Sequence, residues 1–290
     1  MLTYQAMVDD ATTQLYQASE TPRIDAEILL QHVLDKGIAW LISYGDTVAS
    51  SEHTKAFYQL VEQRQNGQPI AYLIGYRDFW TLSLEVNKHV LIPRPDTETL
   101  VEAALDCLSQ NSEPRLLDLG TGSGAIALSL AKELPQSRVI AVEYQKSALA
   151  VAKRNATKNK VNNVEFVLSN WYEKISAENK FDLIASNPPY IEPEDAHLSQ
   201  GDLRFEPITA LSSNENGLAD LRIIIENAAN YLKPEGHLIV EHGYKQAEDV
   251  EALFKKNGFS SIELHKDIND LPRCTIGKIA ERKIAQHQND

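Results

Sequence analysis

The chain has few cysteines, no long apolar run and no excess of basic residues. Among its 290 residues, the two cysteines, Cys107 and Cys274, give neither a disulfide framework nor a metal-ligand spacing. No stretch approaches the roughly 18 apolar residues that a membrane helix needs. The first ten residues lack the basic and then apolar pattern of a signal peptide. These absences predict a cytoplasmic protein with no metal site and no membrane span.

The excess of acidic residues limits the classes of partner. The formal net charge is -13, whereas the hydrophobic share of 43% and the charged share of 24% are ordinary for globular proteins. An acidic surface repels the phosphate backbone, which argues against a broad nucleic-acid footprint. A local basic patch or a basic partner protein remains compatible with this charge.

Helical periodicity characterises residues 1–75. Thr21 followed by Pro22 predicts a helix that starts with Thr21 as the N-cap and proline at the first helical position. A second helix is predicted from Ser51 to Gly67. We expect an N-terminal helical domain, 1–75, whose functional role would be substrate docking. The apolar residues expected on one face of the first of these helices are Ile24, Ile28, Leu29, Leu30, Val33 and Leu34.

Two segments lead into the rest of the chain. Residues 76–92 contain two short apolar runs that predict a β-hairpin connecting two domains, and the second run is Val90-Leu-Ile92. Pro93 and Pro95 end this segment. A helix is then predicted over 96–108, at the start of a catalytic domain that spans 93–290.

From Arg115 onward, strand patterns alternate with helix patterns. This alternation predicts an α/β fold with a mostly parallel seven-stranded sheet that helices cover on both faces. The last two strands have no helix between them and therefore predict a C-terminal antiparallel hairpin. The expected strands are 115–119, 138–143, 163–168, 181–186, 236–241, 260–266 and 274–280, and the expected helices are 123–134, 145–159, 217–232 and 245–257.

A glycine-rich turn follows the first of these strands. Gly120, Gly122 and Gly124 let the backbone take positive φ and let a ligand approach it closely. The turn lies at the carboxyl end of a central parallel strand, where open α/β sheets bind ligands. Glu143, at the end of the second strand, could bind both hydroxyls of a ribose. These features predict a nucleotide-like cofactor, either NAD or S-adenosylmethionine, because the glycines also satisfy a permissive dinucleotide fingerprint.

Two residues favour S-adenosylmethionine. Asp118 immediately precedes the turn, where a carboxylate attracts an ammonium or sulfonium group but poorly suits a pyrophosphate. Trp171 follows the third strand and could pack against an adenine face, although a core aromatic residue would give the same pattern.

The segment Asn187-Pro-Pro-Tyr190 ends the fourth strand. Proline fixes its own φ and restricts the preceding residue, so the Asn187 side chain and the Pro188 carbonyl can be held as two fixed acceptors. Such a pair could bind both N–H groups of a planar NH2 and leave one face of its nitrogen open to a methyl donor. Tyr190 could lie flat against the same group. An ordinary turn is the alternative, but the position after a glycine-rich strand–turn–helix favours catalysis.

With both motifs present, the sequence resembles the peptide-chain release factor N5-glutamine methyltransferase family. These are Rossmann-like class I enzymes that use S-adenosylmethionine to methylate the glutamine of the Gly-Gly-Gln motif in release factors. Asn-Pro-Pro-Tyr is shared with adenine methyltransferases, whereas the segments around Arg94 and Arg204 are more particular. The resemblance extends over nearly the whole chain and is carried by residues 67–75, 90–98, 118–124, 187–190, 204–207 and 241–243.

The resemblance implies roles for individual residues. Asn187, Pro188 and Tyr190 would be catalytic, and the N-terminal domain would dock the release factor. The implied substrate-binding residues are Asn187, Pro188, Pro189 and Tyr190. Arg94 is a further candidate for substrate binding because it lies between two prolines near the site, although a surface charge would give the same pattern. The implied cofactor-binding residues are Asp118, Gly120, Thr121, Gly122, Ser123, Gly124, Glu143, Asn170, Trp171 and Asn187.

The alternative function is DNA or RNA adenine N6-methylation. Adenine N6 is also a planar conjugated NH2 group, so the same two acceptors would serve. The acidic charge and the absence of a basic, aromatic-rich strand-binding region argue against it. We therefore expect glutamine methylation, with release factors as partners and no direct contact with nucleic acid.

Overall fold

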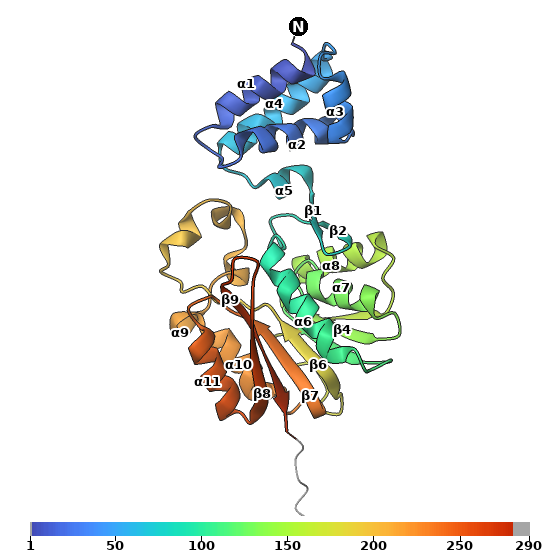
Figure 1. Ribbon diagram of the computed structural model, residues 1–290, viewed down its shortest axis with the longest axis vertical. Coiled ribbons are helices and arrows are strands. Elements are labelled where there is room, and N and C mark those ends of the chain that lie inside the picture. Colours follow the sequence, from blue (N-terminus) through green and yellow to red (C-terminus); the bar gives the residue numbers. More distant parts are fainter. Residues whose placement is uncertain (1, 281–290) are drawn as a thin grey trace, which may run out of the picture. The chain divides into compact units, whose positions relative to one another are not determined.

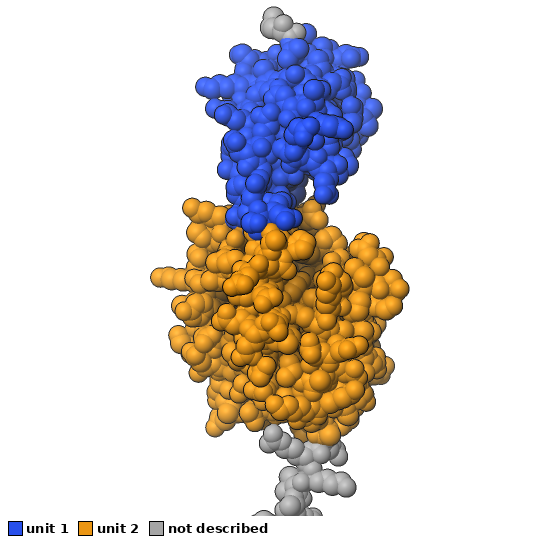
Figure 2. All heavy atoms as spheres, turned by 90° about the vertical axis from the view of Figure 1, so that its left-hand side faces the viewer, with its two compact units in different colours: residues 1–76, 199–205 blue, residues 77–198, 206–290 orange. Residues whose placement is uncertain are grey.

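The computed structural model describes residues 2–280 and divides into two compact units (Figures 1 and 2). Unit 1 extends to Tyr76 and also includes Ser199–Phe205. Unit 2 comprises Arg77–Leu198 and the described chain from Glu206 onward. Among the described residues, no helix has both the length and the apolar character needed to cross a membrane.

Unit 1 is helical, as the sequence predicts for this region. Its side chains bury an apolar core that includes Met7, Leu30 and Phe57. The longest helix begins after Ser50, whose hydroxyl oxygen accepts a hydrogen bond from the His53 backbone N–H at 3.1 Å. The helices are α1 (Tyr4–Leu15), α2 (Pro22–Leu34), α3 (Ile38–Tyr44), α4 (Ser51–Gln65) and α5 (Ile70–Ile74).

Two details of α2 differ from the prediction. Pro22 occupies the start of the helix as expected, but the Thr21 side chain does not cap it. The Thr21 hydroxyl instead donates to Asp25 Oδ1 at 3.2 Å. Ile24 is 55% exposed, because it lies two residues before the buried Ala26 and therefore on the opposite side of the helix.

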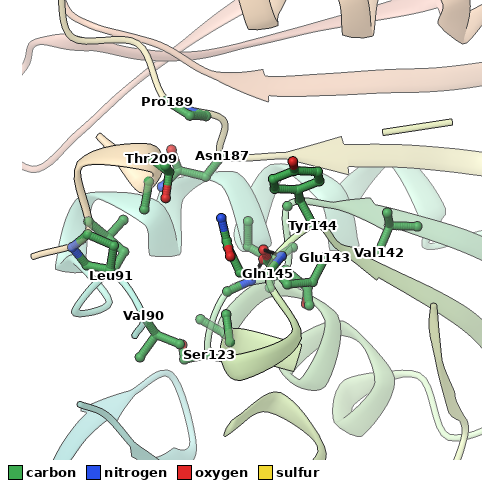
Figure 3. A pocket seen from close by; sticks show the side chains of 18 of the residues that line it. Val90, Leu91, Ser123, Val142, Glu143, Tyr144, Gln145, Asn187, Pro189 and Thr209 are labelled. Atoms are coloured by element: carbon green, nitrogen blue, oxygen red, sulfur yellow. Dashed lines mark hydrogen bonds between the residues drawn. The ribbon is translucent and has the colours of Figure 1, made fainter. Parts of the chain in front are cut away.

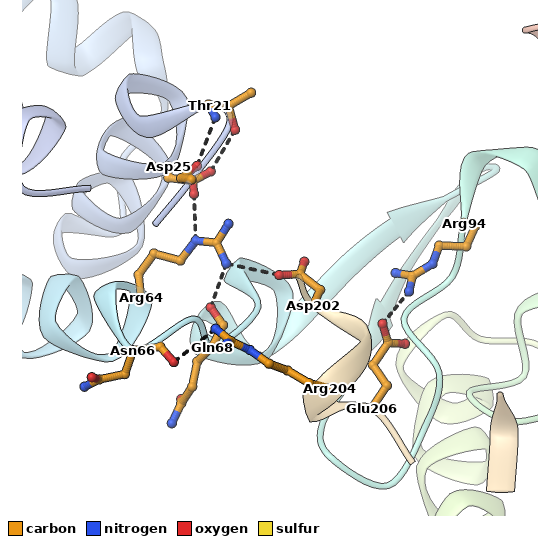
Figure 4. A network of polar contacts seen from close by, with 10 residues as sticks. Thr21, Asp25, Arg64, Asn66, Gln68, Arg94, Asp202, Arg204 and Glu206 are labelled. Carbon is orange, nitrogen blue, oxygen red and sulfur yellow. Dashed lines mark hydrogen bonds and ion pairs between the residues drawn. The ribbon is translucent and has the colours of Figure 1, made fainter. Parts of the chain in front are cut away.

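A segment distant in sequence belongs to unit 1. The Arg64 guanidinium of α4 donates to Asp25 Oδ2 at 2.7 Å, to the Gln68 carbonyl at 3.1 Å and to Asp202 Oδ1 at 3.1 Å (Figure 4). The side chains of Arg64 and Asp25 are both nearly buried. This charged cluster holds Ser199–Phe205 within unit 1, although these residues fall inside the range predicted for the catalytic domain.

Unit 2 is built on the predicted seven-stranded sheet. The strands follow the order β5-β4-β3-β6-β7-β9-β8, and β9 runs antiparallel to both of its neighbours. The other neighbouring pairs are parallel. Because β8 and β9 follow one another in the sequence and pair antiparallel, the predicted C-terminal hairpin is confirmed. The strands are β3 (Arg115–Leu119), β4 (Arg138–Glu143), β5 (Val164–Leu168), β6 (Phe181–Ser186), β7 (Leu232–Glu241), β8 (Phe259–Lys266) and β9 (Pro272–Ile279).

Helices cover both faces of this sheet (Figure 1). Successive residues of a strand point to opposite faces. Leu116 accordingly packs in the cluster that contains α6 and α7, and Leu117 packs in the cluster that contains α10 and α11. The helices of unit 2 include α6 (Glu98–Leu108), α7 (Ala125–Glu133), α8 (Lys146–Lys158), α10 (Ala219–Ala228) and α11 (Ala247–Lys256).

The segment before α6 was only partly predicted. A hairpin is present, with β1 at Tyr76–Phe79 and β2 at Leu82–Glu85, but Val90-Leu-Ile92 is not a strand. The Ile92 N–H donates to Glu206 Oε2 at 2.9 Å instead of to a neighbouring strand. The first turn of the predicted helix over 96–108 is a 3-10 turn, η1 (Pro95–Thr97), which leads into α6.

The predicted helix over 217–232 is too long. Only α10 (Ala219–Ala228) falls within it, α9 (Asn214–Gly217) ends where it was expected to begin, and β7 begins at Leu232 instead of residue 236. The sheet explains the early end of α10, because the Tyr231 carbonyl accepts from the Phe181 N–H at 2.8 Å and Leu232 pairs with Phe181. Competition from strand pairing therefore ends the helix.

Candidate active site

The candidate site is a cavity of about 210 Å³ within unit 2. Side chains from the glycine-rich turn, from the end of β4 and from the loop after β6 surround one space (Figure 3). All three segments follow parallel strands that lie next to one another in the sheet. The cavity therefore lies at the carboxyl ends of these strands, where open α/β sheets bind ligands.

The glycine-rich turn has the backbone that the sequence predicts. Gly120, Gly122 and Gly124 have φ of 76°, 55° and 90°. A Cβ atom on Gly120 would lie 3.2 Å from the Trp171 ring, so glycine lets the two segments pack closely. The N–H groups of Gly120 and Thr121 donate to the Val142 carbonyl at 2.9 and 2.8 Å, which joins the turn to the end of β4. Gly120, Thr121, Gly122 and Ser123 line the cavity, whereas Gly124 does not.

Glu143 lines the cavity and is only 9% exposed. Its Oε2 accepts from the Gly122 N–H at 2.9 Å, and its Oε1 accepts from the Gln145 N–H at 2.8 Å. Burial raises the pKa of the Glu143 carboxyl. Each carboxylate oxygen can accept a further hydrogen bond, so this residue can bind a ligand diol while it holds the turn.

Asp118 is buried and does not line the cavity. Its Oδ2 accepts from the Ala127 N–H at 3.2 Å, at the start of α7. Its Oδ1 is buried and makes no close hydrogen bond within residues 2–280, although the Thr121 hydroxyl lowers the pKa of the carboxyl as a hydrogen-bond donor. Burial raises the pKa of this carboxyl to about 7. A positively charged ligand group near the turn would favour the ionised form.

Asn170 and Trp171 both line the cavity and come from the segment after β5. Trp171 Nε1 donates to Asp220 Oδ1 at 3.2 Å, and Asp220 is also part of the wall. The Asn170 side-chain amide is exposed and donates to Glu173 at 2.7 Å. The indole is therefore held by a partner, whereas the Asn170 amide is engaged in a local turn.

Asn187 and Pro189 lie in the cavity wall (Figure 3). Asn187 Nδ2 donates to Thr97 Oγ1 at 3.2 Å. Its Oδ1 accepts no hydrogen bond from the described part of the chain, so this oxygen is available to a ligand. One residue earlier, the Ser186 hydroxyl donates to the Leu119 carbonyl at 2.7 Å. That bond connects the loop to the strand that carries the glycine-rich turn.

Pro188 and Tyr190 are not part of the cavity wall, although both were expected to meet the substrate. The Tyr190 ring packs against the core, and its hydroxyl donates to Glu241 Oε1 at 3.0 Å. The Tyr190 carbonyl accepts from Gln246 Nε2 at 3.1 Å. A Cβ atom on Gly217 would lie 2.0 Å from that carbonyl oxygen, so the loop requires glycine there. The structure therefore fixes the loop firmly but does not present the Tyr190 ring to the cavity.

Arg94 also lies outside the cavity wall. Its guanidinium forms an ion pair with Glu206, whose side chain is fully buried (Figure 4). The same carboxylate accepts from the Ile92 N–H. This pairing connects the segment before α6 to the segment that follows residue 205, and Pro207 in the latter lines the cavity.

Several residues of the wall, among them three polar ones, had no role predicted from the sequence. Thr97, Thr209 and Asp220 line the cavity, although none belongs to the glycine-rich or Asn-Pro-Pro-Tyr motif. Thr97 lies within the segment 90–98 that carries the family resemblance, which is a local signal. No pattern in the sequence pairs Asp220 with Trp171, because these residues meet only through the packing of α10 on the sheet.

Two family models match the chain. One is described as "Methyltransferase domain" and matches residues 110–287. The other is described as "PrmC N-terminal domain" and matches residues 6–75. The first model alone covers more than half of the chain.

The curated relatives carry one name. The chain is 47% identical to the release factor glutamine methyltransferase of Aliivibrio fischeri, over 90% of this chain and 92% of the relative. It is 46% identical to the release factor glutamine methyltransferase of Salmonella typhimurium, over 95% of this chain and 98% of the relative.

A solved structure supports the fold. The T. Thermophilus 16S rRNA N2 G1207 methyltransferase, solved with AdoMet and guanosine, matches with a TM-score of 0.53 and 19% identity. The match covers 70% of this chain and 49% of that protein. This level of identity shows the class I methyltransferase fold alone. Because the close sequence relatives match along nearly their whole length, the chain belongs to the release factor glutamine methyltransferase family.

Proposed function

We propose that this protein transfers a methyl group from S-adenosylmethionine to the side-chain amide nitrogen of a glutamine, the one in the Gly-Gly-Gln motif of a peptide-chain release factor. The names of the relatives support the substrate. The observation that carries the chemistry is the Asn187 Oδ1 acceptor, which is available at the wall of the cavity that begins at the glycine-rich turn.

The described residues fit S-adenosylmethionine. The turn from Gly120 to Ser123 would hold the methionine part, Glu143 the ribose and Trp171 the adenine. Asp118 lies in β3 just before the turn, and its buried Oδ1 makes no close hydrogen bond within the described chain. A carboxylate in this position suits a ligand that carries positive charge. When bound, S-adenosylmethionine supplies an electrophilic methyl carbon on a sulfonium.

The residues of the loop would prepare the amide nitrogen for attack. Its lone pair is delocalised into the carbonyl, and the rotation barrier of roughly 18–20 kcal/mol for peptide amides indicates the strength of that resonance. Asn187 Oδ1 and the Pro188 carbonyl would each accept one N–H of the glutamine. These two contacts would hold the NH2 plane fixed and leave one face of the nitrogen open. Positioning of this kind lowers the activation free energy by about 7–11 kcal/mol.

The same two acceptors would stabilise the transition state. As the N–C bond forms and the C–S bond breaks, positive charge develops on the nitrogen and its N–H groups become more acidic. Hydrogen bonds from these groups to Asn187 and Pro188 therefore strengthen during the step, as catalysis requires. The methylated amide then loses one proton to water, since an N-protonated amide is a strong acid and needs no dedicated base.

Unit 1 would provide the docking surface for the release factor. Its α3 exposes large apolar side chains, with Ile42 77% exposed and Tyr44 55% exposed. Exposed apolar side chains that gather on one element are typical of protein-binding surfaces. A protein that modifies a translation factor would act in the cytoplasm.

The test is transfer of one labelled methyl group. The protein is incubated with labelled S-adenosylmethionine and a release factor, and the product is digested and sequenced by mass spectrometry. We expect a single added methyl on the glutamine of Gly-Gly-Gln, and none on a matched release factor in which that glutamine is replaced by alanine. Label on a different residue, or only on added nucleic acid, would overturn the proposal. No observation favours adenine N6-methylation as a second function.

A further inference from the structure

The Pro188 carbonyl, the second acceptor in the proposed mechanism, needs a fixed direction. Asn187 has a partner for its side-chain amide, because Nδ2 donates to Thr97 Oγ1 at 3.2 Å. Neither Pro188 nor Pro189 has a backbone N–H, so this stretch cannot be held by donating to a neighbouring segment. Their rings fix φ, however, which makes the stretch stiff. The direction of the Pro188 carbonyl therefore depends on what holds the next residue, Tyr190.

Gln246 holds the backbone of Tyr190. Its Nε2 donates to the Tyr190 carbonyl at 3.1 Å and also to the Asn216 carbonyl at 3.0 Å. Its Oε1 accepts from the Gly243 N–H at 2.8 Å. A carbonyl can only accept and a backbone N–H can only donate. These three backbone partners therefore fix which end of the Gln246 amide faces the loop.

Gln246 is itself attached to a packed part of unit 2. It occupies the N-cap position of α11, and its backbone N–H donates to the Gly243 carbonyl at 2.9 Å. Val250 and Phe254 of the same helix are fully buried in the core. The side chain of Gln246 therefore reaches the loop from a rigid helix, although Gln246 does not line the cavity.

The backbone around this amide is unusually close and unusually bent. A Cβ atom on Gly217 would lie 2.7 Å from Gln246 Nε2, as well as 2.0 Å from the Tyr190 carbonyl oxygen. The preceding Asn216 has φ of 56°, which residues other than glycine rarely adopt. Such conformations persist only where their surroundings hold them, and they cluster at functional sites. The hydrogen bond from Gln246 to the Asn216 carbonyl is one such restraint, so a single amide joins this turn to the loop.

We propose that Gln246 is a positioning residue for methyl transfer. Its amide fixes the Tyr190 carbonyl, and the stiff Pro188-Pro189 stretch transmits this restraint. The Pro188 carbonyl then keeps the direction in which it can accept an N–H of the substrate amide. This inference rests on the proposed methyl transfer to a glutamine.

The test compares two substitutions of Gln246 that differ in their hydrogen-bond donors. Gln246→Met keeps the length of the side chain and removes its donors, whereas Gln246→Lys provides an ammonium that can donate to the same carbonyls. For Gln246→Met, we expect kcat for release factor methylation to fall about 10- to 100-fold, while the dissociation constant for S-adenosylmethionine stays within about threefold. Gln246→Lys should recover kcat to within several-fold of the wild type. Gln136→Met, at an exposed glutamine in the turn after α7, is the matched control and should leave kcat unchanged.

Hydrogen exchange gives a readout that does not depend on activity. The Ile191 N–H, the next residue of the loop, donates to the Leu211 carbonyl at 3.0 Å. Its exchange should become faster in Gln246→Met and recover in Gln246→Lys, while exchange of the β3 amides stays unchanged. The number of cofactor sites per chain, measured by titration calorimetry, reports the fraction of native protein in each variant.

Each outcome decides the inference. A Gln246→Met variant with the wild-type kcat would refute it, and so would a Gln246→Lys variant as slow as Gln246→Met. A fall in kcat that only matches a loss of cofactor sites would show that Gln246 serves stability alone. If Gln246→Met does not fold, Gln246→Glu makes the same comparison, because it keeps the acceptor for Gly243 and removes the donors. If the wild-type protein itself fails to methylate the release factor, the proposed function is wrong, and that result is distinct from the failure of the Gln246 variants.

Discussion

Replacing Asp118 by asparagine should stabilise the cofactor-free protein at neutral pH and weaken its binding of S-adenosylmethionine. The carboxyl is 1% exposed, and one of its oxygens makes no close hydrogen bond in the described chain. An asparagine has nearly the same shape, and its oxygen can still accept from the Ala127 N–H. The substitution therefore removes the charge with little change in packing.

The magnitude follows from the pKa of the Asp118 carboxyl. Burial raises this pKa from 3.8 to about 7. Between these two values the unfolded chain has lost the proton whereas the folded protein keeps it, so the stability of the wild type falls as pH rises. At about 1.4 kcal/mol for each pH unit, the penalty reaches on the order of 4 kcal/mol at pH 7 and above. The asparagine variant lacks this penalty at every pH.

The assay is hydrogen exchange of the β3 backbone amides in the cofactor-free protein, at pH 5, 6, 7 and 8. Exchange of these amides reports the opening of the sheet of unit 2 itself. The difference in stability between Asp118→Asn and the wild type should grow with pH and level off above pH 7. Glu173→Gln, a substitution at an exposed carboxyl in the same unit, should give no such pH-dependent difference. Glu241 also has a pKa raised by burial, to about 7, but it is present in both proteins and cancels in the comparison.

Cofactor binding provides the second half of this test. A cationic ligand near the turn stabilises the ionised carboxyl, so titration calorimetry at pH 8 should show weaker binding to Asp118→Asn. The reasoning about Asp118 is refuted if both proteins lose stability equally as pH rises. It is also refuted if the variant binds S-adenosylmethionine as tightly as the wild type at pH 8.

Three further substitutions test other parts of the account. Asn187→Ala should lower kcat about 10²- to 10³-fold with cofactor affinity within several-fold, because it removes an acceptor used in the transition state; an equal loss of binding and rate would mean that the residue is structural. Glu143→Ala should raise the cofactor dissociation constant, since it removes a diol acceptor and also the partner of the Gly122 N–H; unchanged affinity in titration calorimetry would contradict the ribose role. Arg64→Ala should destabilise unit 1 by about 3–5 kcal/mol, because Asp25 is left buried and unpaired; unchanged hydrogen exchange in α2 and α4 would contradict this.

The core of the fold could be predicted because its signals are local. β3 and β6 were predicted to the residue, since each is a short apolar run bounded by a turn signal. The positive φ of Gly120, Gly122 and Gly124 was also predictable from the spacing of the glycines. Segments whose partners lie far away in the sequence were less predictable. Val90-Leu-Ile92 has the composition of a strand, but Ile92 pairs with the side chain of Glu206.

The candidate site shows the same division. Asn187, Glu143 and the turn were identified because each lies at or directly after the end of a predicted strand, and neighbouring parallel strands bring their ends together. The directions of Arg94 and Tyr190 could not be read from the sequence. Both were expected to meet the substrate, but each is bound to a buried glutamate that the chain supplies from more than 50 residues away.

The most direct test of the central claim is a crystal structure of the protein with S-adenosylhomocysteine and a release factor that carries the Gly-Gly-Gln motif. We predict that the glutamine amide nitrogen lies in the cavity, within hydrogen-bond distance of both Asn187 Oδ1 and the Pro188 carbonyl, roughly 2.7–3.2 Å. One face of that nitrogen should be turned toward the cofactor sulfur. A glutamine bound outside the cavity, or one whose amide nitrogen contacts neither acceptor, would contradict the account.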